Sequence, residues 1–100
     1  MKNVSAIIEL NKLGVTMKKL VEYGFDGITV AEVSNHIGQI YKMKVRVDIT
    51  VPDEDVIRVR MAIINAAHTG HPGDGRITIT AVEHFINIST GRDEAVARAR

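Results

Sequence analysis

Residues 43–51 read MKVRVDITV. Apolar side chains occupy the odd positions and charged or hydroxyl side chains the even ones, which is the pattern of a strand with one buried and one polar face. Pro52 ends this strand because it has no N–H to donate. The acidic residues 53–55 then provide an N-cap and negative charge for a helix that runs to about His68. The stretch therefore predicts a strand followed directly by a helix.

The rest of the chain predicts a second strand-then-helix unit and two further strands. Val4–Leu10 alternates like a strand, Asn11 offers an oxygen that caps a helix start, and Gly24 closes that helix. Ile28–Val33 is rich in β-branched residues, and Ile77–Ala81 alternates near the end of the chain. The order β-α-β-β-α-β predicts an α+β, ferredoxin-like subunit in which two helices back a four-stranded antiparallel sheet.

The second face of such a sheet has a mixed character. It carries Ile7, Thr29, Asp48, Thr50 and Thr78. These residues are too polar for a core, and they are not an ideal solvated surface either. We therefore expect another subunit to cover this face.

Composition excludes several classes of protein. The chain has 100 residues, a net charge of +1, no cysteine and four aromatic residues. A strongly basic nucleic-acid binder, a disulfide framework and thiolate metal sites are thus disfavoured. We expect one domain over residues 1–91 and a tail over residues 92–100, with no signal peptide or membrane span, in the cytoplasm.

The densest chemical signal is the segment Thr69-Gly70-His71-Pro72-Gly73-Asp74-Gly75-Arg76. Glycines allow backbone amides to approach an anion, and an arginine adds a bidentate charge for phosphate oxygens. The segment leaves a helix and enters a strand, so it is not a Walker loop. Spacing alone leaves open an ordinary helix-to-strand connection whose glycines serve the turn.

Together with its surroundings, this segment resembles the carboxy-terminal signature of the PII signal-transduction proteins. The likeness extends in order through Val4–Ile8, Gly27–Val33, Val45–Asp53 and Thr90-Gly91. The resemblance implies a homotrimer without enzymatic activity that holds adenine nucleotide in clefts between subunits. It also implies a protein partner in carbon or nitrogen metabolism, such as a transporter, enzyme or regulator, and contact with a membrane only through that partner.

The resemblance also implies the site residues, with no metal ligand and no catalytic residue among them. Those expected at the nucleotide are Gly27, Ile28, Thr29, Asp48, Thr50, Gly73, Asp74, Gly75 and Arg76. Those expected near the phosphates or an effector are Gly38, Gln39, Lys42, Asn87, Ser89 and Arg92.

The chain departs from the family pattern in two places. Only a short loop, Ser34–Lys42, stands where typical members have a long mobile partner-binding loop. Asn87 and Ser89 stand where two arginines commonly grip the outer phosphates, and each lost charged contact is worth about 1.5–3 kcal/mol. We therefore expect ADP or AMP to be preferred over ATP. The chain is also similar to carboxysome-associated PII-like proteins, which implies bicarbonate as an effector.

Three other classes of function are weighed against this one. The four histidines, His36, His68, His71 and His84, and the trimer leave open a metal- or anion-responsive structural protein similar to the CutA family. An enzyme would recruit Glu32 or Asp48 as a base, but the chain has no nucleophile elbow and no paired-carboxylate motif. RNA binding would need aromatic residues on the central strand, and residues 43–51 contain none.

Overall fold

The structure is a computed structural model that describes residues 1–98. Its elements are β1 (Lys2–Glu9), α1 (Leu13–Glu22), β2 (Thr29–Ile37), β3 (Ile40–Val51), α2 (Val56–Ala67), β4 (Gly75–Ala81) and α3 (Glu94–Arg98). The four strands form one antiparallel sheet in the order β2-β3-β1-β4. This arrangement confirms the ferredoxin-like fold.

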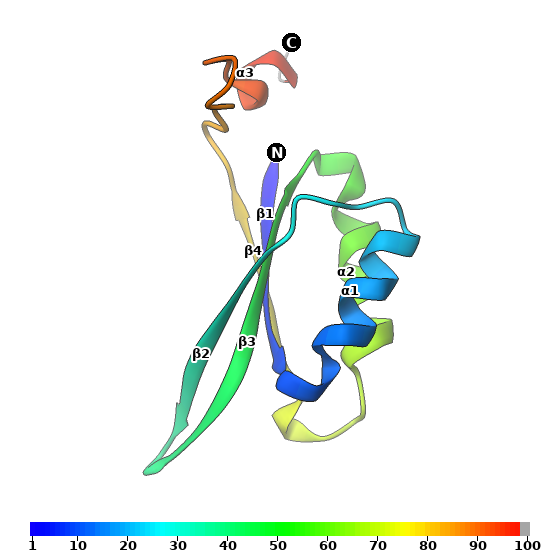
Figure 1. Cartoon of the computed structure of the whole chain (residues 1–100), viewed down its shortest axis with the longest axis vertical. Coiled ribbons are helices and arrows are strands. Elements are labelled where there is room, and N and C mark those ends of the chain that lie inside the picture. Colours follow the sequence, from blue (N-terminus) through cyan, green and yellow to red (C-terminus); the bar gives the residue numbers. More distant parts are fainter. Residues whose placement is uncertain (99–100) are drawn as a thin grey trace.

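Helices α1 and α2 cover one face of the sheet and leave the other face open (Figure 1). The odd positions of β3 from Val45 to Val51 face the helices, as predicted, and Val47 is fully buried there. Met43 was predicted on the same buried face but is 52% exposed, because β3 extends beyond the end of β1 there. Leu20 of α1 and Ile63 of α2 are the largest of the fully buried side chains in the same core. On the open face, the strand register aligns Thr29 with Asp48, Ser5 and Thr78 in one row across the sheet.

The two helix starts differ from the prediction. A 3-10 turn, Leu10–Lys12, precedes α1, and Asn11 does not cap the helix with its side chain. A second 3-10 turn, Asp53–Asp55, precedes α2, again without a side-chain cap. Asp53 instead pairs with the amino terminus of Met1 at 3.1 Å, so this carboxylate fastens the start of β1 to the start of α2.

The loop predicted over Ser34–Lys42 is a β-hairpin. Strands β2 and β3 stay paired as far as Ile37 and Ile40, and Gly38-Gln39 alone forms the turn. Gly38 has a φ of 61°, as the first residue of a tight hairpin turn requires. The last pairs of this hairpin extend beyond the end of β1 and form an arm, residues 34–43 (Figure 1). The turn signal of Gly38 is therefore correct, but Ser34 and Asn35, predicted as part of a loop, lie within strand β2.

The C-terminal segment forms a small unit at the opposite end of the sheet from the arm (Figure 1). The amide of Glu94 donates to the carbonyl of Phe85 at 2.8 Å, and the Asp93 carboxylate lies 2.6 Å from Nδ1 of His84. The predicted division at residues 91 and 92 stays a prediction, and residues 99 and 100 of the predicted tail lie outside the described residues. Within residues 1–98, α2 is the longest helix at 12 residues, and none of the helices could span a membrane.

Candidate functional site

The glycine loop, residues 69–76, is organised around the carboxylate of Asp74. The amides of Thr69 and Gly70 donate to its Oδ2 at 2.7 and 2.9 Å, and the Thr69 hydroxyl donates to Oδ1. The hydroxyl and amide of Thr69 lower the pKa of Asp74 to about 2, with further help from the amide of Gly70. Asp74 is therefore a carboxylate at neutral pH, and its role is to shape the loop.

Gly75 is required by its contact with β1. Its φ is 120°, and a β-carbon at this position would lie 1.8 Å from the carbonyl oxygen of Ile7. Any side chain would force the two backbones apart. The sequence explained this glycine by the approach of an anion, whereas the structure explains it by the approach of the first strand.

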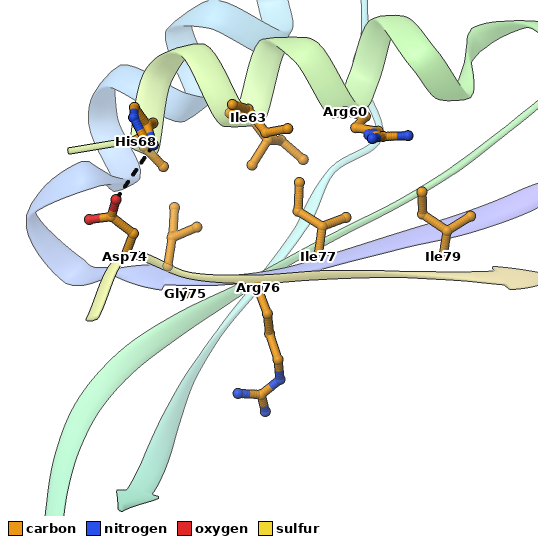
Figure 2. A pocket seen from close by; sticks show the side chains of 11 residues that line it. Arg60, Ile63, His68, Asp74, Gly75, Arg76, Ile77 and Ile79 are labelled. Carbon is orange, nitrogen blue, oxygen red and sulfur yellow. Dashed lines mark ion pairs between the residues drawn. The ribbon is translucent and has the colours of Figure 1, made fainter. Parts of the chain in front are cut away.

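Arg76 projects to the open face of the sheet. Figure 2 shows its side chain pointing away from α2, whereas Ile77 and Ile79 point toward that helix. Its register partner on β1 is Ile7, which also pairs with Arg46 of β3, so the two arginines share one row. Arg46 donates to Asp48 at 2.7 Å, while Arg76 has no hydrogen-bond or ion-pair partner within residues 1–98. The described chain therefore leaves one unpaired guanidinium directly after the glycines.

The helix side of β4 carries a separate hollow of about 380 Å³. Ile63, Ile77 and Ile79 line it, and Arg60 and the His68–Asp74 pair mark its ends (Figure 2). Gly75 and Arg76 also border the hollow, but the Arg76 side chain points to the opposite side of the strand (Figure 2).

The other residues expected at the nucleotide lie on β2, on β3 and in the turn before β2. Thr29 and Asp48 are register partners on the open face, and the Thr50 hydroxyl donates to the Asn3 side chain at 3.2 Å. Burial acts to raise the pKa of Asp48, but hydrogen bonds led by Arg46 outweigh it and hold the pKa below its usual value.

Gly27 adopts a φ of 68° in the turn before β2, and the Ile28 side chain packs against the core. Ile28 can thus offer a ligand little more than its backbone.

Most of the other predicted site residues lie far from the glycine loop within one chain, but the charge of Lys42 helps to lower the pKa of Glu9, which lies beside the loop. Gly38, Gln39 and Lys42 belong to the arm, whose turn is about 16 Å from the end of β1 by strand rise. Asn87, Ser89 and Arg92 belong to the C-terminal unit, beyond the far end of β4 (Figure 1). The Asn87 side chain is engaged there, because it accepts the amide of Ser89 at 2.8 Å.

Sequence reasoning missed the residues that join the loop to the sheet. Lys44, predicted on the polar face of the strand, is only 3% exposed within the single chain. Its ammonium donates to Glu9 Oε1 at 2.9 Å and to the carbonyl of Gly73 at 2.6 Å. These partners are 35 and 29 residues away in sequence, so no local pattern could have indicated them.

The histidines do not assemble a metal centre in the described part of the chain. His68 lies 3.7 Å from Asp74, His71 contacts the Thr69 hydroxyl, and His36 stacks on Tyr41. Within residues 1–98 no group of three or more metal-ligating side chains lies together.

Comparisons with known proteins agree with this geometry. A sequence model of the family described as Nitrogen regulatory protein P-II matches residues 1–92. The chain is 38% identical to Nitrogen regulatory protein P-II of Rhizobium meliloti, over 91% of this chain and 94% of that protein. It is 37% identical to the protein of the same name from Azospirillum brasilense, with the same coverage. Nitrogen regulatory protein P-II 1 of Escherichia coli is 35% identical, over 97% of this chain and 99% of its own length. The chain with the glycine loop at the start of its edge strand thus belongs to the P-II family of nitrogen regulatory proteins.

Proposed function

We propose that this P-II family regulator senses adenine nucleotide and that its glycine loop receives the phosphates. The observation that carries the proposal is the unpaired guanidinium of Arg76, held on the open face directly after Gly75. A guanidinium beside close-approaching backbone is suited to bidentate contact with phosphate oxygens. Binding then acts by favouring one conformation of the protein, so the output is a change of shape and no reaction is catalysed.

The sheet order supports a nucleotide site shared between two copies. Arg76 lies on one edge strand and Thr29 on the other, three strand spacings apart, or about 14 Å. Neither edge is paired with another strand within residues 1–98, so the β4 edge of one copy can approach the β2 edge of the next. A closed ring of such contacts gives three equivalent clefts in a homotrimer. The C-terminal unit with Asn87 and Ser89 would then reach the phosphates from a neighbouring copy.

The phosphate side of this cleft favours a short phosphate chain. Arg76 supplies a cation, but Asn87 and Ser89 offer only neutral groups to outer phosphates. Two arginines at these positions would make charge-assisted bonds to the additional charge of a triphosphate, and Asn87 and Ser89 cannot make them. We infer a preference for ADP or AMP over ATP.

Melting temperature measured with AMP, ADP, ATP or divalent metal separates the nucleotide sensor from a metal-responsive trimer. A ligand that binds only the folded protein raises the melting temperature with its concentration. We expect a shift with ADP and AMP. A shift with metal alone would overturn the proposal, and calorimetry showing ATP bound more than about tenfold tighter than both would overturn the preference.

We further propose bicarbonate as an effector and the arm as the surface that docks on the protein partner. Hydrogen-bond donors for a small anion are available on the arm from Gln39, Lys42 and the amides of the turn. An apolar surface for the partner is provided by Ile40, Tyr41 and Met43, which expose 71%, 64% and 52% of their surface. Nucleotide titrations with and without bicarbonate test the effector. Equal nucleotide affinities in both titrations would remove it from the proposal.

A further inference from the structure

Lys44 lies where the body of the sheet ends and the arm begins. It pairs with Glu9, the last residue of β1, and with Val33 of β2, whereas the next residue toward the arm, Met43, pairs with Ser34 alone. Its side chain emerges on the open face together with those of Arg46 and Asp48. Arg46 remains exposed there, but Lys44 is 97% removed from solvent, since its exposed fraction is 3%.

The buried ammonium has two partners from different parts of the chain. Glu9 accepts one hydrogen bond at 2.9 Å, and the bond from Lys44 lowers the pKa of the Glu9 carboxyl. The carbonyl of Gly73 accepts another at 2.6 Å. Glu9 also lies close to the loop, because a β-carbon built on Gly73 would lie 3.2 Å from Glu9 Oε1. We call Lys44, Glu9 and the Gly73 carbonyl the clasp.

Within residues 1–98, the clasp is the set of side-chain hydrogen bonds that joins the glycine loop to β1 and β3. The hydrogen bonds of Asp74 connect it to Thr69 and Gly70, which belong to the loop itself. His68, at the loop's edge, is on the preceding segment. Gly73 is two residues before Gly75 and three before Arg76, so the clasp fixes the chain just ahead of the unpaired guanidinium.

We propose that Lys44 and Glu9 are positioning residues that hold the glycine loop in the geometry that receives nucleotide phosphates. The inference rests on the proposed function. Neither residue needs to touch the ligand, because both act through the Gly73 carbonyl. Glu9 serves as a built-in carboxylate partner that holds the Lys44 ammonium in position beside the loop.

Glu9→Gln and Lys44→Met test the clasp, and Lys19→Met is a matched control. Lys19 forms an exposed pair with Glu22 at 3.9 Å on α1, away from the loop. Hydrogen exchange of residues 69–76 in the nucleotide-free protein should be about fivefold or more faster in both clasp variants and unchanged in the control. The ADP dissociation constant should rise about tenfold in Lys44→Met, less in Glu9→Gln, and less than about twofold in Lys19→Met.

Removing a buried ammonium can unfold a chain, so a second variant keeps Lys44 in place. Glu9→Ala leaves room for a small carboxylate beside the ammonium. Formate or acetate should slow exchange of the loop and tighten ADP binding, whereas chloride at equal ionic strength should do neither.

The outcomes separate the two proposals. Wild-type protein that binds no adenine nucleotide overturns the proposed function, and the exchange data still judge whether the clasp orders the loop. Wild-type protein that binds ADP, with clasp variants that match it in loop exchange and affinity, overturns the clasp. A fall in melting temperature without faster loop exchange or weaker ADP binding shows a structural pair and also overturns it.

Discussion

The carbonyl oxygen of Ile7 lies 1.8 Å from the point where Gly75 would carry a β-carbon. The first strand and the glycine loop are thus in backbone contact, with no space for a side chain between them. The same glycine leads directly into Arg76, so the contact that stabilises the edge strand also sets the position of the proposed phosphate ligand.

Gly75→Ala should be strongly destabilising. The added methyl group meets backbone at a φ of 120°, so the expected loss in the free energy of unfolding is about 2–4 kcal/mol. Gly14→Ala is the control, because Gly14 lies in α1 with no atom within 4 Å of its would-be β-carbon, and it should gain about 0.5–1 kcal/mol. Urea unfolding measures both, and equal stability of the two variants would contradict the close approach.

Acid should weaken the fold as the pH falls through the ordinary pKa values of carboxyls that the folded chain holds at lower pKa values. The pKa values of Glu9, Asp48, Asp53, Asp74 and Asp93 all lie below their ordinary values. Between the lowered and the ordinary pKa values, the unfolded chain therefore binds more protons than the folded chain. The free energy of unfolding falls as the pH falls through this range. For Asp74 the loss runs from its ordinary pKa of 3.8 down to about 2.

Urea unfolding of wild type and Asp74→Asn at several acidic pH values checks this prediction. The wild-type free energy of unfolding should decrease steadily from pH about 5 downward, and the variant should show a shallower slope. A carboxyl NMR titration should place the midpoint of Asp74 near 2. A midpoint close to 3.8 would show that the loop hydrogen bonds are not formed in solution.

Much of the fold was predictable because the signals are local. The alternation of residues 43–51 correctly placed Val45, Val47 and Ile49 in the core. The same alternation failed for Lys44, since its burial depends on a loop 29 residues away that closes over it. Local turn signals also failed for residues 34–42, where cross-strand pairing such as His36 with Tyr41 outweighs them.

The candidate site was likewise predictable where its signals are local and unpredictable where it depends on long-range packing. The glycines and Arg76 were identified from residue type and spacing, which are visible in one segment. Their attachment through Glu9 and Lys44 depends on the register between β1 and β3, which the sequence does not specify. Long-range packing is therefore what sequence reasoning lacked at this site.

Arg76→Gln should weaken nucleotide binding without unfolding the protein. A lost hydrogen bond to a charged group is worth about 1.5–3 kcal/mol, so the ADP dissociation constant should rise about tenfold or more. Arg60→Gln is the matched control, because Arg60 is an exposed arginine on the helix side of β4 (Figure 2). Calorimetry with both variants checks the prediction, and an equal loss in the two would assign the nucleotide to the hollow beside α2.

The arm should behave as ordered structure and not as a mobile loop. Its backbone pairs continue to Ile37 and Ile40, so amides over residues 34–43 should exchange measurably more slowly than an unstructured peptide. Gly38→Val, which puts a β-branched residue at a φ of 61°, should speed exchange in the arm and leave α2 unchanged. Immediate exchange of the wild-type arm would contradict the hairpin.

Ser89→Arg should shift nucleotide preference toward the triphosphate. Ser89 is exposed and its amide, not its side chain, holds the turn through Asn87, so an arginine can be introduced there without breaking that bond. One new charge-assisted contact to an outer phosphate should tighten ATP by about tenfold and leave AMP nearly unchanged. Ser89→Gln controls for side-chain length without the charge. Calorimetry with AMP, ADP and ATP separates the outcomes: equal gains for all three nucleotides would show a general electrostatic effect, whereas a gain confined to ATP places residue 89 beside the outer phosphates of a neighbouring copy.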